Sequence, residues 1–323
     1  MSYQFSIERT HPTKVTVGVV VAMVLLIVVG YFAAGCGDRT PDEASAREPV
    51  VAAVPESTPP SVPEEETTLV ISGPVSFAMA DSAYRSRRYD DAVTLFAAYS
   101  ERRPTNPWGF YMLGLSAWKA GQLERAESAF GQALSLDPSH VKSHLNFSRV
   151  LLEAGKPDSA LVHIDTALAL DSTSSEPLRL LGRAYAALDR PDEAEEAYRR
   201  AIVANGEDVW ALNNLGTLYI RLGRFEDALG PLARAVELED GVATFHNNLG
   251  MALEHTGRFG AAASAYRDAL TIEGTYGKAV TNLARVELVK EDPGVAPIDL
   301  TERARLFSEE VERWKQPAVT VEP

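Results

Sequence analysis

A 34-residue period is the feature that most constrains the fold of this chain. The segment "NNLGTLYIRLGRFEDALGPLARAVELE" begins at Asn213, and "NNLGMALEHTGRFGAAASAYRDALTIE" begins 34 residues later at Asn247. A chain with such a period builds one small unit several times, and each unit buries its apolar face against the next. The period therefore predicts a stacked array rather than one globular core.

Small residues hold two positions of the period, and no insertion or deletion interrupts either series. Helices cross most closely where the facing residues are small, so the two series mark the contact of two antiparallel helices within each unit. Glycine between the series fits the turn that joins these helices. The series are Ala80, Gly114, Ser148, Gly182, Gly216, Gly250, Ala284 and Ala92, Ala126, Ala160, Ala194, Ala228, Ala262.

The segment "WGFYMLGLSAWKAGQLERAESAFGQALSLDP", from Trp108 to Pro138, resembles the tetratricopeptide repeat (TPR) at nearly every family position. The resemblance implies an all-α fold, a right-handed superhelix of six 34-residue helical hairpins. The units are expected at 73–106, 107–140, 141–174, 175–208, 209–242 and 243–276.

Residues 277–323 are expected to form a cap and a last helix. The stretch 277–292 is predicted to form a seventh copy of the helix that opens each unit, and this copy caps the end of the array towards solvent. Asp299 and Glu302 form a capping pair that opens a C-terminal amphipathic helix. Its apolar stripe is expected to pack on the end of the array or on a partner.

Asparagines recur on the helix face that lines the groove in this family. The first helices of TPR units form the concave face, and the sixth position of the unit holds Asn146, Asn214, Asn248 and Asn282. In the related superhelix of the nuclear and cytosolic sugar transferase that acts on serine and threonine, such a ladder grips the backbone of an extended peptide. An amide carries an acceptor and two donors, so it can pair with any peptide unit. The alternative is that these amides bond a neighbouring helix and set the superhelical pitch.

Basic residues exceed acidic ones on the same face. From the second unit to the cap, eight basic and three acidic groove positions give +5, within a chain of formal charge −14. Arginine can hold carboxylates in bidentate fashion, so such a trough attracts acidic segments or a terminal carboxylate. The alternative is that these cations are solvated or pair with the acids. The basic positions are Lys119, Lys142, Arg149, Arg179, Arg183, Arg221, Lys278 and Arg285, and the acidic ones are Glu153, Glu176 and Glu254.

The predicted peptide-binding groove combines these amides and cations with aromatic side chains. Trp108, Tyr111, Trp118 and Trp210 supply anchoring surface, or they pack between repeats. The residues assigned to the groove are Asn146, Arg149, Arg183, Asn213, Asn214, Arg221, Asn247, Asn248, Lys278, Asn282, Arg285, Trp118 and Trp210.

An uncharged apolar run at residues 15–34 predicts a membrane anchor. As a helix it spans about 30 Å, the thickness of a bilayer core. Arg9 and Lys14 precede it, so the N-terminus is expected in the cytoplasm and the repeats on the periplasmic side of a bacterial membrane. The run is either a retained signal anchor, which places the protein in the inner membrane, or part of a lipoprotein signal. "FAAGC" resembles such a signal, with Cys36 lipidated and the protein in the outer membrane.

Residues 37–72 are predicted to form a disordered tether. They hold six prolines and eight acidic residues against two basic ones, with few large apolar side chains. Such a segment cannot bury enough apolar surface to offset the entropy that ordering would cost. The folded part can therefore work away from the membrane surface.

The sequence predicts binding rather than catalysis. The six histidines lack metal-binding spacing, and no phosphate loop or nucleophile elbow is present. We therefore expect no catalytic residue, metal or cofactor, and the acidity argues against nucleic acid as a partner.

Two functions remain. One is a scaffold that binds an extended acidic segment of an envelope protein. The other is an envelope assembly factor, of the pilus or outer-membrane biogenesis type, that docks folded subunits through its outer faces.

Overall fold

The computed structural model describes residues 9–10, 68–69, 73–290 and 292–316. The predicted anchor at 15–34, Cys36 and nearly all of the predicted tether lie outside these residues. The chain divides into two units, Met1–Gly73 and Pro74–Pro323. In the first unit, strands β1 (Arg9–Thr10) and β2 (Thr68–Leu69) pair antiparallel. Among the described residues, no helix has the length and apolar character needed to cross a membrane.

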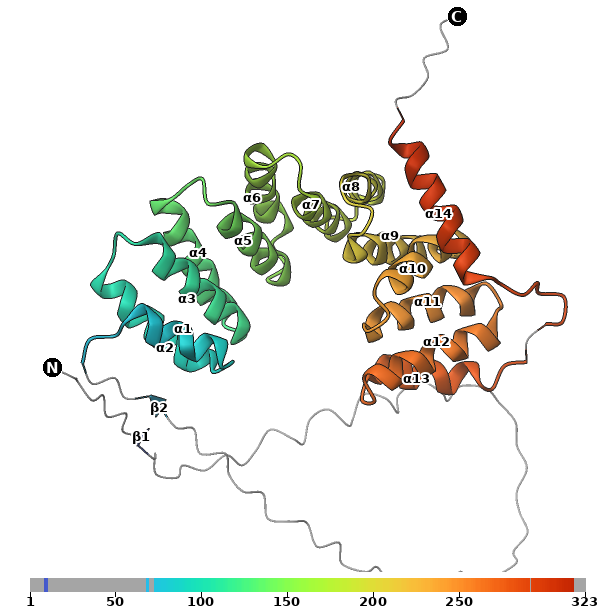
Figure 1. The fold of residues 1–323 in the computed structure, drawn as a ribbon, viewed down its shortest axis with the longest axis horizontal. Coiled ribbons are helices and arrows are strands. Elements are labelled where there is room, and N and C mark those ends of the chain that lie inside the picture. The colour runs from blue at the N-terminus through green and yellow to red at the C-terminus, as the bar shows by residue number, and fades with distance from the viewer. Residues whose placement is uncertain (1–8, 11–67, 70–72, 291, 317–323) are drawn as a thin grey trace, which may run out of the picture. The chain divides into compact units, whose positions relative to one another are not determined.

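The described part of the second unit is all-helical, as the sequence predicted (Figure 1). Each odd-numbered helix from α1 to α11 packs against the helix that follows it, and each such hairpin packs against the next. We call the odd-numbered helix of a hairpin its first helix and the even-numbered one its second helix. The helices are α1 (Phe77–Arg85), α2 (Tyr89–Arg102), α3 (Pro107–Lys119), α4 (Leu123–Leu136), α5 (Val141–Glu153), α6 (Pro157–Leu170), α7 (Ser175–Ala187), α8 (Pro191–Ala204), α9 (Val209–Arg221), α10 (Phe225–Leu238), α11 (Ala243–His255), α12 (Phe259–Ile272), α13 (Gly277–Val286) and α14 (Leu300–Trp314).

The helices of a hairpin cross at the small residues of the first series. A Cβ atom added at Gly182 would lie 2.4 Å from Cε1 of Tyr198, and one added at Gly216 would lie 2.4 Å from Cγ of Leu232. Real Cβ atoms do not approach so closely, so glycine at these two positions lets Tyr198 and Leu232 reach the first helix. The side chains of the second helices then fill the core between successive hairpins.

The turn inside the hairpins requires a left-handed backbone. Four of these turns carry glycine with φ between 70° and 78°, a conformation that costs glycine nothing. Arg87 and Asp189 take the corresponding place in two other hairpins, with φ of 58° and 56°. The glycines are Gly121, Gly155, Gly223 and Gly257.

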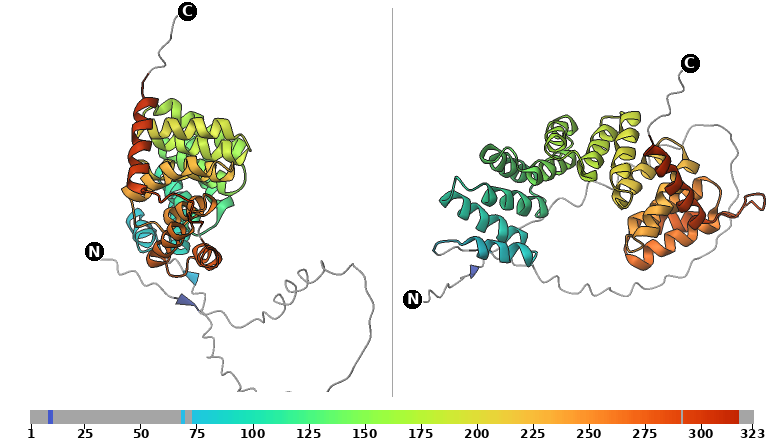
Figure 2. Two further views of the ribbon diagram at one scale, coloured as in Figure 1. Left: turned by 90° about the vertical axis from the view of Figure 1, so that its right-hand side faces the viewer. Right: turned by 45° about the horizontal axis from the view of Figure 1, so that its top comes forward.

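The C-terminal helix α14 does not pack on the end of the array. It lies along α10 and also contacts α8 (Figures 1 and 2). Its N-cap agrees with the sequence, since Asp299 accepts a hydrogen bond from the backbone N–H of Glu302 at 3.0 Å. Phe307 is buried against Gly230, where an added Cβ would lie 3.0 Å from the Cβ of Phe307. The repeat register could not place this helix, because α14 lies outside the repeats.

Candidate peptide-binding face

The residues predicted for the groove lie on consecutive first helices. Besides their contacts with second helices, α5 contacts α7, α7 contacts α9, α9 contacts α11, and α11 contacts α13. These first helices therefore form one continuous face, which lies on the inner side of the arc of helices in Figure 1. The polar side chains on this face fall into three groups with different partners.

On α5, the predicted groove residues are bonded within the array. The Nδ2 atom of Asn146 donates to the hydroxyl of Tyr111 at 3.1 Å, and Arg149 donates to Oδ1 of Asn146 at 2.6 Å. Arg149 also pairs with Glu176 on α7. Burial and two neighbouring arginines lower the pKa of Arg149 to about 10. A ligand that used Asn146 or Arg149 would have to replace these internal bonds.

Between α9 and α13, the asparagines link successive first helices. Asn248 donates to Oδ1 of Asn213 at 2.9 Å, and Asn282 donates to Oδ1 of Asn247 at 3.0 Å. Asn213 and Asn247 are buried, with exposed fractions of 5% and 1%. A buried amide needs such partners, because an unpaired polar group away from water is costly. These bonds are the interhelical packing that the sequence left open as the alternative to peptide contact.

Asn214 is different, and the spacing of the ladder explains why. Each bonded asparagine on the sixth position reaches a residue 35 places earlier, as Asn146 reaches Tyr111. The residue 35 places before Asn214 is Arg179, a side chain without an acceptor, which pairs with Asp208 at 3.2 Å. The Asn214 amide therefore has no hydrogen-bond partner among the described residues.

Asn214 lines a cavity of about 100 Å³ where α7, α8 and α9 meet. We call it the α7–α9 pocket. Arg221 reaches across it to donate to the carbonyl of Ala186 at 2.9 Å, which leaves its other donors available. The lining residues are Ala186, Tyr198, Asn214, Thr217, Leu218 and Arg221.

Two guanidinium groups act on the α7–α9 pocket without an acidic partner. Burial raises the pKa of Tyr198, whereas the charges of Arg183, Arg221 and Arg179 oppose that rise. Among the described residues, the side chain of Arg183 forms no hydrogen bond or ion pair, and Arg221 forms no ion pair. Tyr198 was not assigned to the groove from the sequence, because it is the core residue that packs on Gly182.

Of the other residues that the sequence assigned to the groove, some are bonded within the array and others are exposed. Arg285 holds Glu254 through two bonds of 2.7 and 2.8 Å, and Lys278 is exposed without an ion pair among the described residues. Trp118 donates from Nε1 to Glu153 at 2.7 Å, so its indole is fixed. Trp210 packs edge-on against Phe245, and the Trp210 side chain is 46% exposed.

Trp108 adds a second open aromatic surface. It stacks on Tyr111 with ring centroids 5.0 Å apart and meets His140 edge-on at 5.3 Å. With Pro107, Asp137 and His140 it lines a shallow pocket, and it is 49% exposed. An aromatic surface of this kind suits an apolar side chain of a bound segment.

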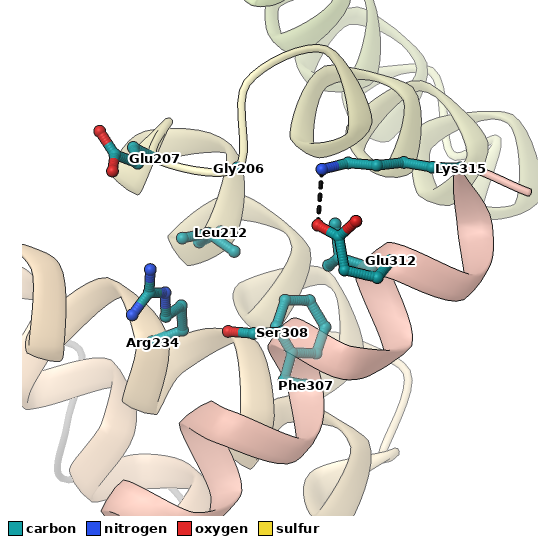
Figure 3. A pocket seen from close by; sticks show the side chains of 9 residues that line it. Gly206, Glu207, Leu212, Arg234, Phe307, Ser308, Glu312 and Lys315 are labelled. Carbon is teal, nitrogen blue, oxygen red and sulfur yellow. Dashed lines mark hydrogen bonds and ion pairs between the residues drawn. The ribbon is translucent and has the colours of Figure 1, made fainter.

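Another cavity lies beneath α14, beside the turn that joins α8 to α9 (Figure 3). Phe307 and Val311 of α14 line it together with Leu212 of α9. Its cations are satisfied, because Lys315 pairs with Glu312 at 2.7 Å and Arg234 pairs with Glu237 at 2.6 Å. This cavity is therefore part of the contact between α14 and the array.

No group of three or more histidine, cysteine or acidic side chains within 73–290 and 292–316 is placed to hold a metal ion.

Family models described as tetratricopeptide repeat match residues 213–277 and, in two overlapping stretches, 117–183 and 151–208. The chain belongs to the tetratricopeptide-repeat family. Such arrays are protein-interaction scaffolds, and this TPR chain has the fold of one.

Solved structures of other proteins share this fold. A thermophilic TPR protein of Thermus thermophilus is 22% identical, over 57% of this chain and 100% of its own, with a TM-score of 0.51. A TPR protein of Parabacteroides merdae is 13% identical, over 65% and 82%, with a TM-score of 0.57. The Cut9–Hcn1 hetero-tetramer of APC/C contains a chain 19% identical over 65% of this one and 41% of its own, with a TM-score of 0.56. No curated protein matches the chain.

Proposed function

We propose that this TPR protein is a membrane-tethered scaffold whose concave face binds an extended acidic segment of another envelope protein. One observation carries the proposal. In the α7–α9 pocket, the Asn214 amide has no partner and the Arg221 guanidinium group has no acidic partner among the described residues, and neither has the Arg183 guanidinium group on α7. Charge-assisted bonds from arginine to a carboxylate are the strong ones, and an amide beside them can hold the adjacent peptide unit.

The contact set is narrower than the whole predicted groove. Binding at Asn213, Asn247 or Arg149 would break internal bonds, and each broken bond subtracts from the affinity. Binding at Arg183, Asn214 and Arg221 breaks only the bond from Arg221 to the carbonyl of Ala186 at most. Lys278 and Trp210 are exposed at other points of the face and extend the contact along a bound segment.

The test uses fluorescein-labelled extended octapeptides that alternate glutamate with serine, with glutamine replacing glutamate in the control peptide. The binding constant to the full chain is measured by fluorescence anisotropy for wild type and for Arg183→Glu with Arg221→Glu. The matched control is Arg125→Glu with Arg200→Glu, which changes the net charge equally at exposed positions on second helices.

We expect at least tenfold weaker binding for the groove variant and less than a twofold change for the control, at an ionic strength that screens distant charges. Equal losses in both variants would mean that the net charge attracts the peptide without a site. Unchanged binding in the groove variant would reject the α7–α9 pocket.

The tether is the second part of the proposal. The uncharged run at 15–34 and the sequence "FAAGC" ending at Cys36 support an anchor that places the array on the periplasmic side. Incorporation of labelled fatty acid by wild type but not by Cys36→Ala, with recovery in outer-membrane fractions, supports lipidation. Recovery of unlabelled wild type in the inner membrane supports a retained helix, and recovery in the soluble fraction rejects the anchor.

An assembly factor that docks folded subunits is the second candidate. The outer surface of α8 and α10 favours it, because this surface already holds a helix, α14. Charge reversal by Arg183→Glu with Arg221→Glu distinguishes the two functions, because it should not weaken the docking of subunits on the outer faces.

A further inference from the structure

Each first helix presents one side to its own second helix, and we call this side the crossing face. It is formed by the fourth, seventh and eighth residues of the repeat unit, the eighth being the small residue at the helix crossing. In α9 these are Leu212, Leu215 and Gly216, and all three are buried. The equivalent residues of α7 and α11 are buried as well. They are Leu178, Leu181 and Gly182 in α7, and His246, Leu249 and Gly250 in α11.

The crossing face of α13 has the same composition but is open. Its residues, in the same register, are Val280, Leu283 and Ala284. Val280 is 49% exposed and Ala284 is exposed, while Leu283 is half-buried. Leu288, in the turn that follows α13, is 86% exposed. A helix that only solvates the end of an array would carry polar residues at these places.

The reason for the exposure is the path of the chain. After α13 the chain does not turn back to form a second helix. It continues to α14, which packs against α10 and α8. Phe307 against Gly230 and an ion pair of 3.1 Å between Arg303 and Glu226 hold α14 there. Within the described residues, the crossing face of α13 is therefore left without the helix that its sequence is suited to contact.

We propose that the crossing face of α13 binds an amphipathic helix of another protein, packed as the second helices pack within the array. The proposal concerns a different surface from the groove and does not rest on the proposed function. Continuity with an interface that the chain itself builds repeatedly supports it, since Phe130 packs on Gly114 and Tyr266 on Gly250. Alanine also serves at the crossing, because Ala80 and Phe96 occupy the matching positions in the first hairpin and are both fully buried.

The chemistry of the face defines the helix it fits. One phenylalanine, tyrosine or leucine would face Ala284, with apolar residues three and four places away against Val280 and Leu283. Lys290 is exposed beyond the end of α13 and forms no ion pair among the described residues. It therefore favours an acidic residue on the border of the bound helix.

The probe is a fluorescein-labelled peptide of residues 190–205, the α8 segment, because Tyr198 in it already packs on a crossing glycine. Its binding to the full chain is measured by anisotropy. The test variant is Val280→Glu with Ala284→Glu. The matched control, Gly277→Glu with Thr281→Glu, adds the same charge at exposed positions on the other sides of α13. A second peptide carries Tyr198→Ser.

We expect saturable binding to wild type, at least tenfold weaker binding to the test variant and to the serine peptide, and less than a twofold change for the control. Reversal of Arg183 and Arg221 should leave this binding unchanged. Failure of the peptide to bind wild type, or equal losses in test and control variants, would overturn the proposal. Sedimentation supplies a further check, since self-association that the test variant abolishes would make a second copy the occupant and reject a foreign helix.

Discussion

The Nδ2 atom of Asn248 donates a hydrogen bond to Oδ1 of Asn213 at 2.9 Å, across the interface of α11 and α9. The bond explains why the chain keeps asparagine in pairs. The first asparagine of a pair is the buried acceptor for the next first helix, and the second donates to the preceding one. At Asn214 the preceding acceptor is missing, so the same residue type is structural at one position and open at another.

This difference predicts opposite outcomes for two alanine substitutions on one face. Asn248→Ala leaves the buried Oδ1 of Asn213 without its donor, and we expect a loss of about 1–3 kcal/mol in the free energy of unfolding. Asn214→Ala removes an amide that has no partner within the described part of the chain, and we expect a change below about 0.5 kcal/mol. Urea unfolding followed by circular dichroism measures both. Equal losses would mean that the two amides have the same role.

The period alone could predict the hairpins, the crossing residues and the face that carries the asparagines, because each follows from register within one unit. Register cannot predict which asparagines have a hydrogen-bond partner. Each bond depends on the residue 35 places earlier, and that residue varies between units: for Asn214 it is Arg179, which has no acceptor. Nor could it predict where α14 lies. That position depends on Gly230, where the other five units carry a side chain: Thr94, Ser128, Val162, Glu196 and Ser264.

The crossing glycines should tolerate no side chain, in contrast to an open glycine. Gly182→Ala places a Cβ 2.4 Å from the Tyr198 ring, so we expect it to destabilise the array by about 1–3 kcal/mol through overpacking. Gly131 in α4 has nothing within 4 Å of the added Cβ. There, alanine should stabilise the helix by about 0.5–1 kcal/mol. Thermal unfolding of the two variants checks the pair, and a Gly182→Ala protein as stable as wild type would contradict the crossing geometry.

The contact between Gly230 and Phe307 should decide whether α14 stays on the array. Gly230→Leu fills the place of the Phe307 side chain, so we expect α14 to detach while the hairpins stay folded. Ser264→Leu, at the equivalent exposed position of α12, serves as the control. Hydrogen exchange read by mass spectrometry should show protection lost over 300–314 in the first variant alone. Protection of α14 retained in Gly230→Leu would mean that other contacts hold the helix.

A histidine pair should make stability fall in mild acid. His144 bonds the carbonyl of Pro138 through Nε2 at 3.0 Å, and its Nδ1 lies 3.1 Å from Nδ1 of His163. When Nε2 of His144 donates to that carbonyl, its Nδ1 is the acceptor and Nδ1 of His163 is the donor. Burial, and then the nearby His144, lower the pKa of His163 to about 4. The unfolded chain, with a histidine pKa of about 6.5, therefore takes up a proton before the folded one does.

The sign follows from that order. Stability contributed by neutral His163 is complete above pH of about 6.5, falls as the pH drops towards 4, and levels off below it. The total loss is about 1–3 kcal/mol, because solvent screens part of the effect at this half-buried ring. Urea unfolding between pH 4 and 7 gives the unfolding free energy as a function of pH, and its slope against pH should be smaller for His163→Gln than for wild type. His255 is an exposed histidine, so His255→Gln should keep the wild-type slope. Identical slopes for His163→Gln and wild type would show that protonation of His163 does not oppose folding.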